Sequence, residues 1–390
     1  MNSLERFKRI CRGEKPDYYP IFGIRGAPGF SGNCLTRTVH DRLVQMGMPD
    51  VGGVFENDGT FGDPAGWNKY WGVSNPMMFE GPPMEGFAEP LHWDIKTEDG
   101  FEILTCETGA VTRQVINNNV TYSMPEFISF HVHDRKSWER YKERCAPGKP
   151  YSEEQLDALY LKYKDRTEPL LMGSASTYGA LRGLVGPYMA CTIHYDDPEL
   201  ARDIYEWHRE YARKYVYPVI KKVKPDIMAA GEDISYNHGM LISPKMFNEF
   251  CAQTYVEAAE VAKEAGVTLF AVDSDGFVEE LVPLLEAAGV NGLFPWEVKA
   301  GNNLMRVREK HPEFIMLGGI EKEILNEGNG DLIRPEIMGK VPQMLKAGRY
   351  FPNGDHGMQP YATYENLLKT MTLLHEVCEN PEGDFPRVAV

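Results

Sequence analysis

Short apolar segments alternate with longer amphipathic segments through the second half of the sequence, and this alternation constrains the fold more than any other feature. The apolar segments have the length and composition of strands, and the amphipathic segments carry apolar residues at helical spacing. The predicted strands span 170–176, 225–233, 268–276, 291–297, 314–320 and 349–356. The predicted helices span 196–223, 243–266, 278–289, 303–311, 335–348 and 363–377.

The predicted helices carry capping residues at their ends. Asp196 or Asp197 is placed to cap the first helix, with Pro198 in its first turn. Ser243 is placed to cap the second helix, and Gly266 to end it. Strands that are apolar throughout are typical of parallel sheets covered by helices on both faces. The number of strand–helix units favours a closed (β/α)8 barrel, the TIM barrel, over an open doubly wound sheet.

The first part of the chain lacks this regularity, and we expect it to elaborate a single barrel domain spanning 1–390. Residues 1–165 would supply the first strand, insertions and a lid, and residues 166–378 the regular units. The segment 59–87 is rich in Gly, Pro and aromatic residues, which is loop composition. Further expected elements are an amphipathic helix in 1–17, a β-hairpin from 101–109 and 111–124, and a helix in 150–166.

Charge and composition exclude several classes of protein. The formal net charge is -16, which disfavours nucleic acid as a partner because phosphate binding needs a basic surface. No apolar run reaches the roughly 18 residues of a membrane span, and the charged N-terminus lacks the apolar core of a signal peptide. We therefore expect a cytoplasmic protein without a membrane partner. The 7 cysteines are scattered without a CxxC pair, which argues for separate reduced thiols.

Polar residues follow the predicted strands where TIM-barrel enzymes carry their active sites. Buried carboxylates need a cation, a proton or a substrate, so repeated acids at strand ends indicate chemistry. Such acids and a histidine suit a divalent metal such as zinc, and without a metal they suit acid–base catalysis. The strand-end residues are Ser174, Ser176, Tyr178, Glu232, Asp233, Asp273, Ser274, Asp275, Trp296, Glu297, Asp355 and His356.

Each of these candidates also has a structural interpretation. Asp275 precedes the predicted helix 278–289 and can act as its N-cap. His356 can be a structural residue of its turn. Glu232 and Asp233 can form an ion pair with Arg182 or Arg25.

The chain resembles the uroporphyrinogen decarboxylase superfamily, including its cobalamin-linked methyltransferases, over roughly 165–378. The resemblance is carried by YDDPELARDIYEWH, GEDISYNHGMLISPKMFNEF, VTLFAVDSDG and GDHGMQPYATYENL, and PIFGIRGAPGF stands where the family has its first strand and arginine loop. The decarboxylases have an Arg-Gln-Ala-Gly-Arg loop that binds propionates. Here Arg25 matches the first arginine of that loop, and the second arginine is missing. Tyr178 aligns loosely with a substrate-facing tyrosine of the decarboxylases.

The methyltransferase branch is closer in its chemistry. Its zinc members use a His-x-Cys pair after one strand and a Gly-Cys-Gly turn near the end of the chain. The matching positions here are Asp273-Ser274-Asp275 and Asp355-His356-Gly357, so oxygen and nitrogen ligands would replace sulfur. Such a site is a harder Lewis acid, which suits an ether or alcohol oxygen better than a thiol.

The resemblance therefore implies a corrinoid-dependent methyltransferase that takes a methyl group from a small methoxylated compound, for example an aryl methyl ether, or from another methylated substrate. Zinc held by Asp273, Asp275, His356 and Glu297 would polarise the leaving oxygen, with His356, Asp275 and Glu232 as catalytic groups. Arg25, Tyr178, Arg182 and Trp296 would contact the substrate. Phe61, Trp67, Tyr70, Trp71 and Trp296 can line an apolar pocket or pack in the core or lid.

No Asp-x-His-x-x-Gly motif is present, so cobalamin would come on a partner corrinoid protein. The resemblance also makes a homodimer the expected oligomeric state. The alternatives are a metal-free decarboxylase in which Arg25 and Arg182 hold carboxylates of a smaller acid, and a non-catalytic subunit that docks a corrinoid protein.

Overall fold

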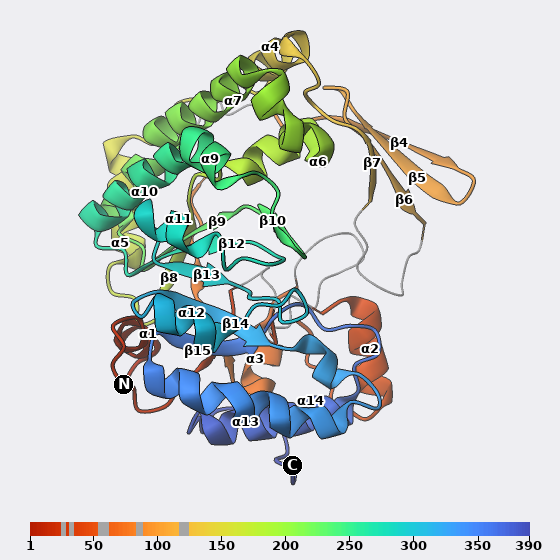
Figure 1. The fold of residues 1–390 in the computed structure, drawn as a ribbon, viewed down its shortest axis with the longest axis vertical. Coiled ribbons are helices and arrows are strands. Elements are labelled where there is room, and N and C mark those ends of the chain that lie inside the picture. Colours follow the sequence, from red (N-terminus) through yellow and green to blue (C-terminus); the bar gives the residue numbers. More distant parts are fainter. Residues whose placement is uncertain (25–28, 31–34, 54–61, 83–88, 117–124) are drawn as a thin grey trace.

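A parallel sheet of seven strands forms the centre of the computed structural model, which describes residues 1–24, 29–30, 35–53, 62–82, 89–116 and 125–390 (Figure 1). The strand order is β15-β14-β13-β12-β9-β8-β3. These strands are β3 (Met77–Met78), β8 (Leu170–Gly173), β9 (Ile227–Gly231), β12 (Leu269–Asp273), β13 (Gly292–Phe294), β14 (Ile315–Ile320) and β15 (Tyr350–Gly354).

Two further strands complete the curled sheet as a barrel. β1 (Ile21–Phe22) pairs in parallel with β2 (Val73–Ser74), which directly precedes β3 along the chain. On the other side of β1, the Asn353 amide of β15 donates to the carbonyl of Phe22 at 2.9 Å. β1 thus lies between the two ends of the larger sheet, and the predicted α/β barrel is confirmed.

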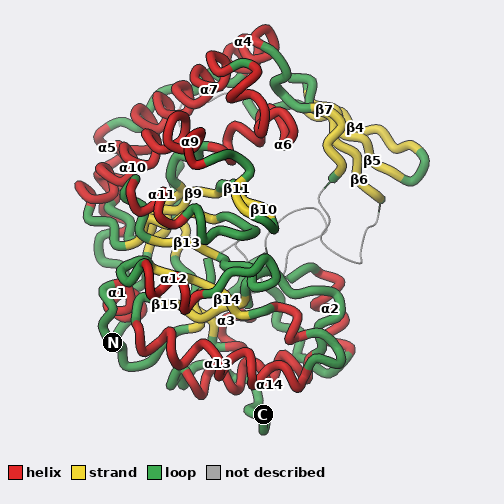
Figure 2. Tube along the Cα trace, in the orientation of Figure 1, coloured by secondary structure: helices red, strands yellow, loops and turns green. Residues whose placement is uncertain are grey.

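Helices surround the strands on the outside (Figure 2). π-helical segments η2 (Ala212–Val216) and η3 (Phe247–Cys251) join α7 to α8 and α9 to α10, and η4 (Lys322–Leu325) is a 3-10 helix. The α-helices are α1 (Ser3–Cys11), α2 (Arg37–Gln45), α3 (Ala65–Trp71), α4 (Arg135–Arg144), α5 (Glu153–Tyr163), α6 (Tyr178–Asp196), α7 (Pro198–Tyr211), α8 (Tyr217–Val223), α9 (Pro244–Met246), α10 (Ala252–Ala265), α11 (Val282–Ala287), α12 (Leu304–Lys310), α13 (Gly330–Ala347) and α14 (Tyr364–Val377).

The caps predicted for two of these helices are confirmed. Asp197 accepts a hydrogen bond from the Leu200 amide at the start of α7. Ser243 accepts from the Met246 amide at the start of α9. Gly266 ends α10 in the left-handed conformation with φ 75°, which glycine adopts without a steric penalty.

Two hydrophobic clusters divide the core, because successive residues of a strand point to opposite faces. The larger cluster lies between strands and helices. The smaller one fills the barrel, and α1 contributes to it by closing the N-terminal end, where the rings of Phe7, Phe22 and Phe351 lie 5.3 to 5.5 Å apart. Its strand residues are Phe22, Leu171, Ile227, Leu269, Ala271, Phe294, Ile315, Leu317 and Phe351. These residues identify the inward-facing positions of each strand.

A four-stranded antiparallel sheet stands beside the barrel on the side opposite α1 (Figure 1). It consists of β4 (Trp93–Glu98), β5 (Phe101–Cys106), β6 (Val111–Val115) and β7 (Glu126–Ser129). The predicted hairpin is confirmed in β5 and β6, although residues 117–124 lie outside the described residues. The flanking strands β4 and β7 were not expected.

The expectation of a loop throughout 59–87 is wrong. This segment contains α3, β2 and β3. Trp67 and Trp71 are fully buried and fix the short helix in the core, and Gly72 ends it at φ 64°. The glycine-rich flanks have loop composition, but tertiary packing stabilises a helix between them. Among the described residues, no helix is long and apolar enough to cross a membrane.

Candidate active site

The carboxyl ends of neighbouring strands bring most of the predicted acids to one end of the barrel. β9, β12 and β13 are adjacent, and they are followed by Asp233, Asp275 and Glu297 respectively. β15 is followed by Asp355 and His356. We call this end, opposite α1, the barrel mouth; it is where TIM-barrel enzymes carry their catalytic groups.

Asp273 is the last residue of β12 and continues its inward-facing row. Leu269 and Ala271, four and two residues earlier, both lie in the barrel interior, so alternation turns Asp273 inward as well. Burial raises the pKa of Asp273 well above its ordinary value, and the negative charges of Asp275 and Asp233 raise it further. Asp273 therefore holds a proton more tightly than an ordinary carboxyl.

Asp275 and His356 come from different strand ends and face each other. The Oδ2 atom of Asp275 lies 3.5 Å from Nε2 of His356, and each side chain is 40% exposed. The hydrogen bond to Asp275 raises the pKa of His356, although burial opposes it. Among the described residues, the buried Oδ1 of Asp275 has no hydrogen-bond partner. Because α11 begins only at Val282, Asp275 is not its N-cap.

Asp233 forms an ion pair with Arg182, which is the structural interpretation that the sequence offered for this residue. Its carboxylate lies 2.6 Å from the Arg182 guanidinium. It also accepts a hydrogen bond from the Asp275 amide at 3.4 Å. The backbone of Asp233 has φ 42°, an uncommon conformation that turns the chain at the end of β9. Arg25, the other predicted partner and a predicted substrate contact, lies outside the described residues.

Glu232, predicted to be catalytic, lies on the helix side of the barrel wall. It is one residue beyond the inward-facing Gly231, so its side chain points out of the barrel, where it is 1% exposed. Its carboxylate accepts hydrogen bonds from the Thr177 and Gly179 amides at 2.8 and 2.7 Å. Burial raises its pKa. Glu232 thus satisfies amides at the start of α6 rather than facing the barrel mouth.

Tyr178 and Trp296 are core residues in the structure rather than the predicted substrate contacts. Both are fully buried and belong to the cluster between barrel and helices. The hydroxyl of Tyr178 lies 3.5 Å from Sγ of Cys191. The indole of Trp296 donates to the Leu293 carbonyl at 2.7 Å. Both lie outside the strands, Tyr178 as the first residue of α6 and Trp296 two residues after β13 with φ 69°, so strand alternation does not set the direction of their side chains.

The described aromatic residues of the predicted pocket pack in the core instead. The indole of Trp67 donates to the Phe30 carbonyl at 2.9 Å, and Trp71 is buried beside it. Tyr70 is hydrogen-bonded to Tyr364 through its hydroxyl. Phe61 lies outside the described residues.

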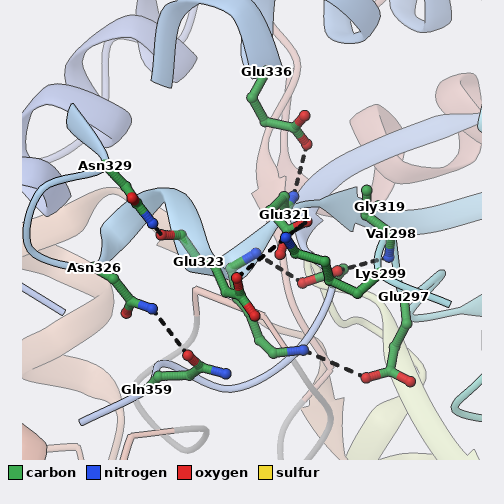
Figure 3. A network of polar contacts seen from close by, with 12 residues as sticks. Glu297, Val298, Lys299, Gly319, Glu321, Glu323, Asn326, Asn329, Glu336 and Gln359 are labelled. Atoms are coloured by element: carbon green, nitrogen blue, oxygen red, sulfur yellow. Dashed lines mark hydrogen bonds and ion pairs between the residues drawn. The ribbon is translucent and has the colours of Figure 1, made fainter. Parts of the chain in front are cut away.

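A network of charged groups links Glu297 to the ends of β14 and β15 (Figure 3). Glu297 accepts from the Gly276 amide at 2.8 Å and lies 3.5 Å from Nζ of Lys322. Asp355 is fully buried and accepts from the amides of Val298 and Lys322. Burial raises its pKa, and Lys322 partly offsets the effect. Lys322 and Glu321 were missed by the sequence analysis, although they directly follow a predicted strand and the same rule would have found them.

The expected zinc ligands are only partly brought together. Asp275 and His356 are paired, and the charge of Asp275 acts on Asp273. Glu297 is already engaged by Lys322. Within the described parts of the chain, no group of three or more His, Cys, Asp and Glu side chains is arranged to hold a metal ion. Among the described side chains, only Asp275 and His356 of the expected ligands stand paired without another charged partner, and zinc stays a prediction.

Comparison with solved structures shows the same fold elsewhere. A methyltransferase from Methanosarcina mazei is similar over 97% of this chain and 99% of its own, with a TM-score of 0.56 and 14% sequence identity. Neither a family model nor a curated protein matches the sequence. At this identity the likeness shows the fold alone.

Proposed function

We propose that this chain is a methyltransferase that moves a methyl group from a small methoxylated compound to the reduced cobalt of a corrinoid carried by a partner protein. The proposal is carried by the group Asp273, Asp275 and His356 at the barrel mouth. It is supported by the full-length likeness in fold to a protein described as a methyltransferase.

The reaction sets a specific demand on the protein. Cobalt in the Co(I) state donates an electron pair to the methyl carbon, so a Co–C bond forms and cobalt becomes Co(III). The C–O bond breaks, and its electron pair stays on the oxygen of the donor. An alkoxide or phenoxide is a poor leaving group unless a proton or cation neutralises the developing charge.

The residues at the barrel mouth can meet this demand with a proton. The pKa of Asp273 is raised by desolvation and by the negative charges of Asp275 and Asp233, so this carboxyl holds its proton tightly. His356 holds a proton through its contact with Asp275. Either group can protonate the leaving oxygen, and Asp275 stabilises the positive form of His356. We assign Asp273 and His356 as the acids and Asp275 as the residue that orients His356.

Zinc, if bound, would supply Lewis-acid activation of the same oxygen. Asp275 and His356 are the residues nearest to forming such a site. The acid catalysis described above requires no step through a metal, and the metal content of the protein is a separate prediction.

Methyl transfer to free cob(I)alamin tests the proposal without the partner protein. Wild-type protein should convert cob(I)alamin to methylcobalamin in the presence of methoxylated phenols. The change in visible absorption measures this conversion. Asp273→Asn and His356→Ala should lose most of this activity. Asp331→Asn, in an exposed position on α13, is the matched control and should retain it. Equal rates in all four proteins would show that the mouth acids do not act in the reaction.

A further inference from the structure

Two glycines lie at the inward-facing ends of neighbouring strands, where they leave part of the barrel mouth free of side chains from the described residues. Gly173 ends β8 and Gly231 ends β9, and both are exposed. A Cβ atom added to either would meet no atom of the described residues within 4 Å. Ala229, paired with Gly173 across the two strands, lies between them. We call Gly173, Ala229 and Gly231 the glycine wall.

The usual structural reasons for glycine do not apply at these two positions. Neither residue has a positive φ, unlike Gly318 and Gly319 at the end of β14. On the side where a Cβ would stand, neither lies against another part of the described backbone. By contrast, a Cβ on Gly179 would lie 2.3 Å from the carbonyl oxygen of Gly231. Glycine within a strand weakens it, and one recurring reason for its presence is the close approach of a ligand.

The glycine wall lies next to Asp273 at the barrel mouth. Gly231 pairs with Asp273 across β9 and β12, so the wall adjoins the carboxyl that we assign as an acid. Adjacent strands lie about 4.8 Å apart and residues two apart along a strand about 6.6 Å apart. The glycine wall, whose only side chain is the methyl group of Ala229, thus spans about 5 by 7 Å, the footprint of one six-membered ring.

We propose that Gly173 and Gly231 determine specificity by providing the seat for a flat, ring-sized group of the substrate, with its methoxy oxygen toward Asp273. The proposal rests on the proposed function for the identity of the reacting group. The seat itself rests on the two strand ends. A larger residue at either position would fill the space that the ring needs, while a one-carbon donor such as methanol would still reach Asp273.

Valine substitutions test the seat directly. Gly173→Val and Gly231→Val add a residue that strands favour, in a space free of described atoms, so neither should lower the melting temperature. Gly339→Val in α13 adds the same atoms at another open, exposed glycine and is the matched control. The probe is 2-methoxyphenol, with binding measured by calorimetry and ligand-observed NMR, and methyl transfer measured separately with 2-methoxyphenol and with methanol.

We expect wild type and Gly339→Val to bind 2-methoxyphenol equally, and both mouth variants to bind it at least tenfold more weakly. The ratio of activity with methanol to activity with 2-methoxyphenol should rise in the mouth variants. Binding that is unchanged in Gly173→Val and Gly231→Val, or absent from wild type, would overturn the seat. Binding to wild type without any methyl transfer would instead contradict the proposed function and leave the seat standing.

Discussion

Replacement of Glu232 separates a structural role at the barrel wall from a catalytic one. In Glu232→Ala the amides of Thr177 and Gly179 lose their acceptor at the start of α6. A buried donor left without a partner costs about 1 to 3 kcal/mol, so two of them predict a loss of about 2 to 6 kcal/mol in the free energy of unfolding. This is a large part of the roughly 5 to 15 kcal/mol that stabilises a typical protein. Glu232→Gln keeps one acceptor oxygen, so one amide loses its acceptor and the variant should lose about 1 to 3 kcal/mol.

Urea unfolding followed by tryptophan fluorescence measures this loss, and methyl transfer is measured on the folded fraction. Both variants should unfold at lower urea than wild type, and Glu232→Gln should keep most of its rate. Glu210→Ala, which removes an exposed carboxyl on α7, is the control and should change neither quantity. The structural assignment is refuted if Glu232→Gln has wild-type stability and no methyl transfer.

Three further predictions concern the acids at the barrel mouth. Since burial raises the folded-state pKa of Asp273, stability should fall as the pH rises from the unfolded value of about 3.9 through the folded one. Asp273→Asn should therefore melt above wild type at pH 8 and together with it near pH 3; lower melting at pH 8 would contradict this. His356 has a raised pKa, so its proton stabilises the fold below about pH 6.5 and is lost as the pH rises through the folded value. The transfer rate should decline over that same range, and Asp275→Asn should move the decline to lower pH; a profile that Asp275→Asn does not shift would remove His356 as the acid. Elemental analysis of protein purified without chelator should find about one zinc per chain, lost in His356→Ala, whereas no zinc in wild type after zinc addition would end the metal prediction.

The barrel could be predicted because its signal is repeated and local. Apolar strands followed by capped helices recur from 170 onward, and the caps at Asp197 and Ser243 lie where the sequence places them. The segment 59–87 was misjudged because α3 is held by burial of Trp67 and Trp71, which depends on distant parts of the chain. The outer strands β4 and β7 lack a comparably clear alternation, since both are largely exposed.

At the end of a strand, a shift of one residue decides which face of the barrel a side chain occupies. Asp273 continues the inward row, whereas Glu232 is one position beyond Gly231 and points outward. The sequence places the end of a strand only approximately, so the parity of the last residues stays undetermined. The pairing of Asp275 with His356 could not be predicted either, because they follow β12 and β15, which two other strands separate in the sheet.

The fate of a labelled methyl group tests the central proposal most directly. Wild-type protein would be incubated with cob(I)alamin and 2-methoxyphenol carrying carbon-13 in its methoxy group, and the products followed by NMR. The proposed reaction predicts carbon-13 methylcobalamin and an equal amount of the free catechol, with both strongly reduced in Asp273→Asn. Absence of label on cobalt with methoxylated phenols and methanol alike, together with release of carbon dioxide from a small carboxylic acid, would contradict methyl transfer and favour decarboxylation.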